Sequence, residues 1–307
     1  MGHTLIEALQ SAGTHKLTAL TRNAGGTGFP KGIRVVQVDY YNHEALVDAL
    51  RGQDCLVIIL AASTPGEVQI NLVRAAAAAG VRWVFPDSWA TDHTHAFPGY
   101  HVDYGGNVEG AIAEIDRLGK SSWISFICSF WYESALAGGP LWLGFDIPGR
   151  SVEFIEDGKT KFNVSTRWLC GEAFQRLLNL PETPAGDGTD SNTAALSNWR
   201  NQPLRVSSFL VSQRDILDSI HRVLGTTDAD WKIEFQTLEE RLKKADKLAE
   251  TEPILGYGLE VHARRLAPGG YGDYETPFGT ANELLGLEKE DLDEATAKIL
   301  KMFNRQG

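Results

Sequence analysis

The fold is decided by the stretch CLVIILAASTPGEVQINLVRAAAAAGVRWVFP, residues 55–86. Its first six residues are apolar without alternation, a pattern typical of a parallel strand that helices cover on both faces. A helical stretch over 66–79 follows, rich in small residues, and Gly80 supplies a left-handed cap. A second apolar strand is predicted over 82–86. This strand–helix–strand order is the repeating unit of a parallel sheet.

The same alternation extends to both sides of this stretch. Further strands are predicted over 17–22, 33–40 and 122–128, and further helices over 4–12, 43–51 and 102–118. We therefore expect an α/β protein with a Rossmann-like, doubly wound parallel sheet. Because a helix opens the chain with no strand ahead of it to pack against, we also expect that the first strand of the complete fold is missing.

After residue 130 the pattern changes. We expect a strand over 151–158, a helix around 168–179, a loop over 181–200 and a strand over 204–211. A helix follows, with its start marked by Ser212 and Asp215 and its end by Gly225. A strand and a helix over 231–250 and two short C-terminal helices over 283–303 complete the chain. The predicted domains are residues 1–130 and a smaller α/β domain, 131–307, partly interleaved with the first.

Composition narrows the class of protein. The chain has 307 residues, 43% hydrophobic and 22% charged, as in a globular protein. The net charge of -11 argues against direct binding to a nucleic-acid backbone. No apolar stretch is long enough for a membrane helix and no signal peptide is recognised, so we expect a cytoplasmic protein. The three cysteines, Cys55, Cys128 and Cys170, lie in apolar runs and are predicted to be buried free thiols.

The chain start carries a fragment of a dinucleotide-binding pattern. In a Rossmann unit a glycine-rich turn joins a strand to a helix whose N–H groups face a pyrophosphate. Gly2 stands where the last glycine of that turn belongs, so Gly2, His3 and Thr4 are predicted to contact the cofactor. The glycine cluster over 24–32 leads into a strand instead of a helix, and we interpret it as a loop.

Charged residues end the next two strands. Arg22, followed by Asn23, lies where an arginine accommodates the 2′-phosphate of NADP, and no acidic residue stands beside it. This favours NADP(H) over NAD, although a solvated strand-end arginine has the same sequence. Asp39 either contacts the adenine amino group or accepts backbone hydrogen bonds in its turn, and both alternatives stay open.

Small residues and a polar loop follow the next two strands. Ala61, Ala62 and Ser63 allow a flat ribose or nicotinamide face to approach the backbone, and they also suit a tight turn before the helix. The loop 86–89 contains Pro86, Asp87, Ser88 and Trp89, which offer a hydroxyl and a stacking surface. A proline–aspartate turn with a buried tryptophan explains the same residues.

A histidine-containing loop raises the question of a metal site. His93, His95 and His101 lie close to Asp92, but their spacing matches no regular metal-binding pattern. We predict no metal here.

In their order and spacing, the segments GHTLIEAL, LTALTRN, VVQVDY, FPDSW, SFWYE and FNVSTRWLCGEAFQRLLNLPE resemble those of fungal NmrA-like and isoflavone-reductase-like proteins, which are atypical short-chain dehydrogenase/reductases. The resemblance spans nearly the whole chain. It implies an NADP(H)-binding Rossmann domain over 1–130 and a substrate-binding domain over 131–307. By position, Gly2 matches the final glycine of the family's GxxGxxG, Arg22 the 2′-phosphate arginine and 86–89 the segment beside the nicotinamide. The substrate-binding residues implied are Trp89, Phe130, Trp131 and Tyr132.

The chain departs from the family at one catalytic position. The reductases of the family carry a lysine where this chain has residues 106–108, and none stands there. Tyr104 is the nearest proton donor, although an aromatic residue that packs at a helix start is an alternative. Tyr104, Ser88 or water would return the proton.

Two functions follow from the resemblance. The first is an NADPH-dependent reductase of a small substrate, aromatic or an enone or ketone. The second is an NmrA-like redox sensor, cytoplasmic or nuclear, that binds the dinucleotide without catalysis and contacts a transcription factor. A chain that binds no dinucleotide is the third alternative.

Overall fold

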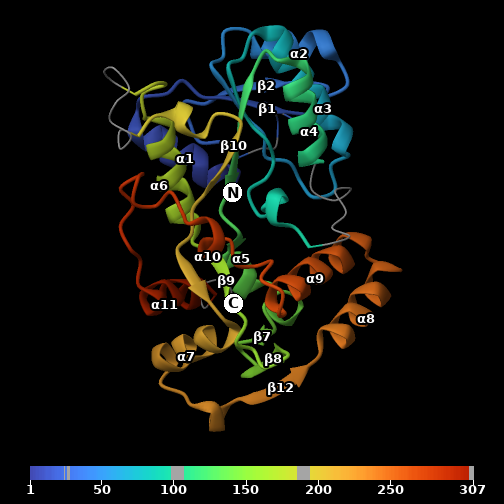
Figure 1. The fold of residues 1–307 in the computed structure, drawn as a ribbon, viewed down its shortest axis with the longest axis vertical. Helices are drawn as coiled ribbons and strands as arrows, with labels where there is room; N and C mark the ends of the chain where they lie inside the picture. Colours follow the sequence, from blue (N-terminus) through green and yellow to red (C-terminus); the bar gives the residue numbers. More distant parts are fainter. Residues whose placement is uncertain (24, 26–27, 98–106, 185–193, 304–307) are drawn as a thin grey trace.

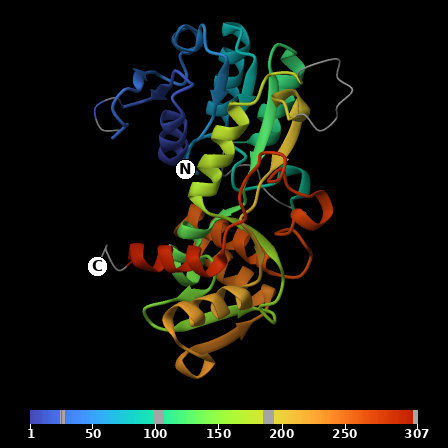
Figure 2. The same ribbon diagram turned by 90° about the vertical axis from the view of Figure 1, so that its left-hand side faces the viewer.

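The computed structural model describes residues 1–23, 25, 28–97, 107–184 and 194–303. An N-terminal α/β part forms the upper half of Figure 1, and a second part with its own sheets forms the lower half. The side view in Figure 2 shows the same division, with the C-terminal helix α11 projecting from the middle.

The strands of the upper part are short and pair only in parallel. β1 (Thr18–Thr21) pairs with β2 (Arg34–Gln37) in a two-stranded sheet. A four-stranded sheet has the order β10-β5-β4-β3, formed by β3 (Cys55–Val57), β4 (Trp83–Phe85), β5 (Ser122–Ile127) and β10 (Gln202–Arg205). These parallel pairs confirm the predicted α/β architecture, and β10 shows that the chain returns to the upper part after residue 200.

Helices cover both faces of the upper part (Figure 1). α1 (Gly2–Ala12) and α6 (Arg167–Leu178) lie on one side, and α2 (His43–Leu50), α3 (Gly66–Ala79) and α4 (Val108–Leu118) on the other. Each side has its own buried apolar cluster. Gly171 lets α1 and α6 approach closely, since a Cβ there would lie 3.2 Å from Thr4 Cγ2 and 3.3 Å from Ala8 Cβ.

The lower part contains two three-stranded sheets around a third apolar cluster. One has the order β12-β8-β7, from β7 (Phe145–Asp146), β8 (Ser151–Ile155) and β12 (Lys232–Gln236). The other has the order β11-β9-β6, from β6 (Phe130–Trp131), β9 (Phe162–Ser165) and β11 (Phe209–Val211). The helices are α5 (Tyr132–Ala137), α7 (Gln213–Leu224), α8 (Leu238–Ala249), α9 (Pro253–Leu266), α10 (Glu275–Phe278) and α11 (Leu292–Phe303).

Most predicted elements are confirmed, with shorter strands than expected. The capping box of Ser212 and Asp215 forms, and Gly225 ends α7 in the left-handed conformation. The helix predicted over 102–118 begins at Val108, with Asn107 as its cap, and residues 102–106 lie outside the described part of the chain.

Two predicted elements are wrong. The single strand predicted over 204–211 is divided between β10 and β11, because the backbone changes partner within it: Val206 N donates to Ile127 O, whereas Ser208 N donates to Val164 O. The first of the two C-terminal helices is absent around residue 285, where the chain forms turns. In addition, α9 was not predicted.

Candidate functional site

The ends of the upper strands place several predicted residues at neighbouring edges. Arg22 follows β1, Asp39 follows β2, and both side chains are exposed. Asn71 Nδ2 on α3 donates to Tyr40 O at 3.2 Å, so the turn after β2 contacts the helix that follows β3. The carboxyl ends of the two sheets therefore lie close together, which is where open α/β sheets bind their ligands.

Arg22 carries the positive charge of this edge. Its side chain is exposed, and among the described residues no carboxylate lies within ion-pair distance of it. Burial raises the pKa of Tyr40, and the charge of Arg22 offsets part of that rise, which places the guanidinium near this ring. Asn23 Oδ1 accepts a hydrogen bond from Gly25 N at 3.0 Å. The guanidinium is thus available to an anionic ligand.

Asp39 and the residues after β3 form turns. Asp39 Oδ1 accepts a hydrogen bond from Tyr41 N at 3.0 Å, which is the turn role predicted as one alternative. Residues 61–63 are exposed, and Thr64 N donates to Ala61 O at 2.8 Å before α3 begins. The tight turn is present, and contact of these residues with an adenine or a nicotinamide stays a prediction.

Asp87 is the most perturbed acid of this edge. Its Oδ2 accepts a hydrogen bond from Leu60 N at 3.1 Å, and its backbone N donates to Gln69 Oε1 at 2.7 Å. Burial raises the pKa of Asp87 to about 7, although the Leu60 N–H opposes the rise. A carboxyl held between the ends of β3 and β4 thus exchanges a proton near neutral pH.

The two residues after Asp87 are buried. Ser88 Oγ lies 3.4 Å from Pro86 O and 3.5 Å from Phe126 O, directed at backbone carbonyls. Trp89 is only 2% exposed, and its Nε1 donates to Ile58 O at 2.9 Å. The tryptophan is thus buried, and contact of residues 86–89 with a ligand stays a prediction.

The three residues 130–132 lie in different environments. Phe130 is buried with its ring stacked on His262 at 4.2 Å. Trp131 is partly buried, and its Nε1 donates to Cys128 Sγ at 3.4 Å. Tyr132 is fully buried, its hydroxyl 2.8 Å from Thr296 Oγ1. Phe130 thereby joins an aromatic stack that the sequence did not predict.

That aromatic group is a stack of Phe130, His262 and Trp142. The His262 ring lies 4.7 Å from Trp142, and His262 Nδ1 lies 2.7 Å from Gly258 O. Burial lowers the pKa of His262 to about 3, so the imidazole is neutral and Nδ1 donates to the carbonyl. No sequence signal indicated this histidine, because α9 itself was not predicted.

Arg265 connects the stack to the loop that follows β4. Its Nη1 donates to Ala90 O at 2.6 Å and its Nη2 to Thr91 Oγ1 at 2.7 Å. Its guanidinium also lies 5.0 Å from the ring of Phe130. The aromatic stack is thereby held against the two residues that directly follow the segment 86–89.

The remaining predicted residues lie at the start of α1 or outside the described chain. The helix begins at Gly2, the His3 ring lies 6.0 Å from Phe29, and Thr4 faces Gly171. Contact of these residues with a pyrophosphate stays a prediction. Tyr104 and His101 lie outside the described residues.

The residues considered for a metal make other contacts. Asp92 Oδ2 accepts from Arg205 Nε at 2.6 Å, and Asp92 Oδ1 accepts from Thr94. His93 Nδ1 lies 3.3 Å from Ser125 Oγ, and His95 Nε2 lies 3.0 Å from Gly270 O. Within the described ranges, no group of three histidine, cysteine or acidic residues is arranged to hold a metal ion.

All three cysteines are free; Cys128 and Cys170 are buried as predicted, whereas Cys55 is partly buried. Of the helices in the described part of the chain, none is both long and apolar enough to cross a membrane.

Known proteins resemble this chain in sequence and in fold. Residues 1–101 match the model of an NAD(P)H-binding family. Oxidoreductase aprR of Aspergillus flavus is 26% identical over 307 residues, covering 98% of this chain and 95% of its own. The crystal structure of an isoflavone reductase has the same fold, with a TM-score of 0.69 at 18% identity over 97% of this chain and 95% of that one. AtPrR2 with NADP+ and (+)-pinoresinol gives a TM-score of 0.68 at 17% identity, with coverages of 97% and 95%.

These matches agree with the order of sequence motifs and with the parallel sheets and helices of the upper part. Residues 1–101 thus match an NAD(P)H-binding family, and the whole chain is similar to a fungal oxidoreductase and has the fold of an isoflavone reductase.

Proposed function

We propose that this protein is an NADPH-dependent reductase of a small aromatic, enone or ketone substrate. The observation that carries the cofactor choice is Arg22, an exposed guanidinium at the end of β1 that no carboxylate of the described residues neutralises. A 2′-phosphate on the ribose supplies the missing negative charge.

The residues at the edge fit the rest of an NADPH molecule. Arg22 and Asn23 would hold the 2′-phosphate of the adenosine, and Asp39 would lie beside the adenine. The exposed small residues 61–63 would allow a flat ring to approach the backbone closely. When bound, NADPH supplies a hydride from C4 of its nicotinamide. The protein's own contribution is to orient both reactants and to exclude water.

The aromatic stack supports an aromatic substrate. Phe130, His262 and Trp142 form a stack in which Phe130 is buried and Trp142 is partly exposed, and Arg265 holds Phe130 beside the loop after β4. Aromatic side chains favour aromatic ligands through offset and edge contacts. Two proteins with the same fold are an isoflavone reductase and AtPrR2 with (+)-pinoresinol, and both of these compounds are aromatic.

The proton that completes a reduction needs a donor. Tyr104, Ser88 and water are the donors predicted from the sequence, and Ser88 Oγ is directed at two backbone carbonyls. Asp87 is a further candidate, because its pKa of about 7 leaves much of the carboxyl protonated at neutral pH. Its Oδ2 is held by Leu60 N, and no hydrogen bond among the described residues engages Oδ1, the atom that would carry the proton.

Binding and turnover test this proposal separately. The protein is titrated with NADPH and with NADH while nicotinamide fluorescence is followed, and NADPH oxidation is then measured against a panel of aromatic ketones and enones. We expect tighter binding of NADPH than of NADH, and turnover of at least one aromatic compound. Absence of binding to either dinucleotide contradicts the proposal.

The redox sensor is the second candidate, and Asn107 favours it. This residue is one of the three, 106–108, that stand near the position where the family's reductases have their lysine, and its side chain caps α4 by accepting a hydrogen bond from Gly110 N at 3.0 Å. An N-cap residue of this kind has a structural role and supplies no ammonium. NADPH binding without turnover of any compound in the panel supports the sensor and contradicts the reductase.

A further inference from the structure

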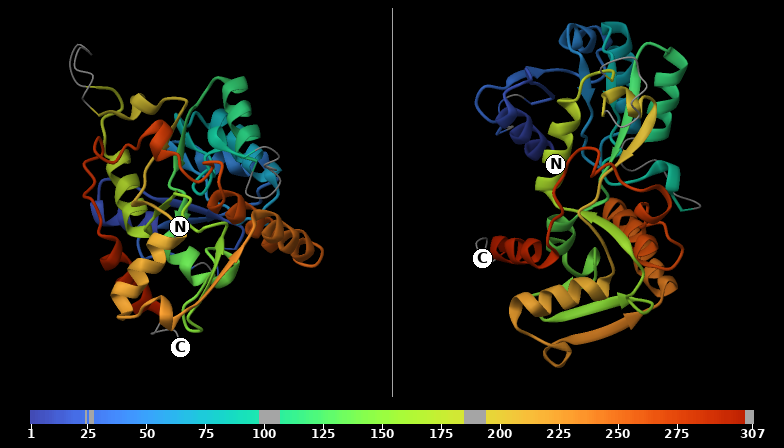
Figure 3. Two further views of the ribbon diagram at one scale, coloured as in Figure 1. Left: turned by 60° about the horizontal axis from the view of Figure 1, so that its bottom comes forward. Right: turned by 60° about the vertical axis from the view of Figure 1, so that its left-hand side comes forward.

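The strand β12 forms an open edge of the lower sheet. In the order β12-β8-β7 it pairs, among the described residues, with β8 alone, in parallel, and it runs along the lower rim of the molecule (Figure 1; Figure 3). Lys232 N donates to Arg150 O, and Gln236 O accepts from Glu156 N. Since alternate residues of a parallel strand bond to the same neighbour, the backbone groups of Ile233 and Phe235 face away from β8.

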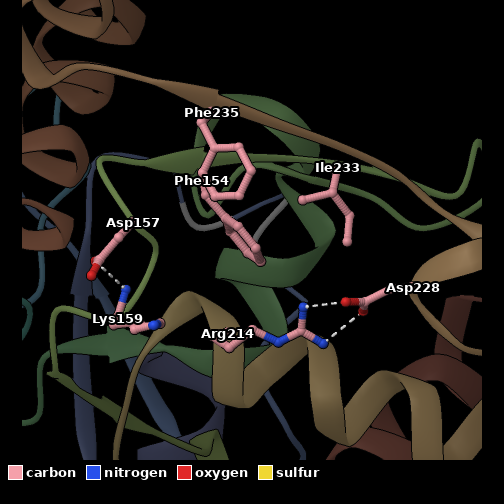
Figure 4. Close-up of a pocket in the computed structure, with 7 residues that line it drawn as sticks. All are labelled: Phe154, Asp157, Lys159, Arg214, Asp228, Ile233 and Phe235. Carbon is pink, nitrogen blue, oxygen red and sulfur yellow. Dashed lines mark hydrogen bonds and ion pairs between the residues drawn. The ribbon is translucent and has the colours of Figure 1, made fainter.

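The two faces of β12 differ in chemistry. Lys232 and Glu234 share one face, where Lys232 Nζ lies 2.9 Å from Glu234 Oε1 and the two side chains are 70% and 50% exposed. Ile233 and Phe235 share the other face with Phe154 of β8 (Figure 4). Phe235 is 64% exposed, the largest exposed fraction of any bulky apolar side chain among the described residues.

A groove of about 420 Å³ opens beneath the apolar face. Figure 4 shows Phe154, Ile233 and Phe235 on one side of it and charged residues on the other. The residues that line it are Phe154, Asp157, Lys159, Arg214, Asp228, Ile233 and Phe235. Arg214 is held by Asp218 and Asp228, so its charge is paired within the chain. The groove has room for another apolar side chain beside Phe235.

We propose that β12 pairs in antiparallel fashion with β12 of a second copy of this chain, around a two-fold axis at Ile233. The sheet β7-β8-β12 then continues without a break into the same sheet of the second copy. A two-fold contact of this kind presents the same surface on both copies. The proposal concerns a surface remote from the reductase function proposed above and does not depend on it.

The charges of β12 favour this register over the two neighbouring ones. With Ile233 at the axis, Lys232 of each copy lies opposite Glu234 of the other, and opposite charges directly across a strand pair are stabilising. With Glu234 at the axis, two glutamates face each other. A shift by one residue sets Ile233 against Glu234 and exchanges the two faces.

An edge strand that avoids pairing has a different pattern. Such strands commonly carry a lysine, a proline or an inward charge that repels an approaching strand. β12 contains no proline, and its lysine has a complementary glutamate two residues away, so a second copy of the strand brings the matching charges. The strand is therefore self-complementary.

Sedimentation velocity of the full chain tests the proposal, up to about 100 µM protein, since a contact of this small size associates weakly. We expect a monomer–dimer equilibrium for the wild type. Lys232→Glu and Glu234→Lys each place like charges opposite one another at both symmetric positions and should weaken the dimer about tenfold. The double variant K232E/E234K exchanges the two charges and should restore wild-type association.

The matched control is Lys120→Glu, which changes the net charge by the same amount as Lys232→Glu. Lys120 is an exposed residue of the upper part, so this variant should leave association unchanged. Circular dichroism verifies that each variant is folded. Phe235→Lys, which removes the exposed apolar side chain, should also give a monomer. A wild type that stays monomeric over the whole range of protein concentration overturns the proposal. It does so even if β12 is then found to bind a strand of another protein. Failure of K232E/E234K to restore the dimer overturns the register.

Discussion

Asp87 makes the stability of this protein depend on pH in a direction opposite to that of most carboxylates. Its ordinary pKa of 3.8 rises to about 7 in the folded chain, because the carboxyl is buried between the ends of β3 and β4. Between these values the folded state binds more protons than the unfolded state. The contribution of Asp87 to the free energy of unfolding therefore decreases as the pH rises from about 4 to about 7.

The magnitude follows from the size of the shift. A difference of about 3 pKa units, at about 1.4 kcal/mol per unit, corresponds to at most about 4 kcal/mol. Asp87→Asn removes the charge and keeps an oxygen that accepts the hydrogen bond from Leu60 N. We expect the variant to be more stable than the wild type by up to this amount near about pH 8, and equally stable near about pH 4.

The assay is urea denaturation at a series of pH values, followed by circular dichroism. Asp48→Asn is the control, because Asp48 is 71% exposed and pairs only with exposed Arg51. The control should change stability by less than about 0.5 kcal/mol at every pH. A D87N variant that is less stable than the wild type near about pH 8, or whose advantage does not vary with pH, refutes the reasoning.

Three further predictions concern stability, each measured by the same denaturation assay. Burial alone would raise the pKa of Asp92, but hydrogen bonds from Arg205 and Thr94 lower it. Arg205→Gln should lower the free energy of unfolding by about 3–5 kcal/mol at neutral pH, because it leaves a buried carboxylate without its partner. A decrease under about 1 kcal/mol contradicts this. Burial lowers the pKa of His262 to about 3, so its contribution to stability is lost as the pH falls from about 6.5 to about 3. His262→Phe should therefore reduce the loss of stability in this acidic range. An unchanged loss of stability argues against this role. Ser212→Ala should cost about 1 kcal/mol through the lost cap of α7, and no measurable loss opposes that role.

Much of the upper part is predictable from sequence because its signals are local. The run 55–60 has no polar face, and Gly80 adopts the left-handed conformation that its position after a helix requires. Arg22 and Asp39 were placed correctly at strand ends, because position along an apolar strand fixes which residues emerge at its carboxyl edge.

Features that depend on distant contacts were not predictable. The sequence PILGYGLEVHARRL of α9 contains Gly256 and Gly258, which weaken a helical signal. The structure explains both glycines: a Cβ at Gly256 would lie 2.6 Å from Ala249 Cα, and one at Gly258 would lie 2.7 Å from the Trp142 ring. The close packing of α9 on α8 and Trp142 is what requires them, and the sequence shows neither contact.

Aromatic residues show the same limit. Trp89 and Tyr132 occupy positions implied for substrate binding, yet both rings are buried, with polar atoms bonded to Ile58 O and Thr296 Oγ1. An aromatic residue in a sequence predicts a large apolar side chain, but it does not predict whether that side chain points to the core or to a ligand. The raised pKa of Asp87 likewise arises from burial between two strands and has no counterpart in the local sequence.

The measurement that tests the central claim most directly is cofactor selectivity before and after Arg22→Asp. Dissociation constants for NADPH and NADH are compared for the wild type, for R22D and for the control Arg34→Asp. Arg34 is an exposed arginine at the first residue of β2, whereas Arg22 lies at the carboxyl end of the parallel strand β1. A charge-assisted contact to the 2′-phosphate, worth about 1.5–3 kcal/mol, predicts that R22D weakens NADPH by at least about tenfold, with little change for NADH and none for the control. Equal weakening of both dinucleotides by R22D would contradict the account.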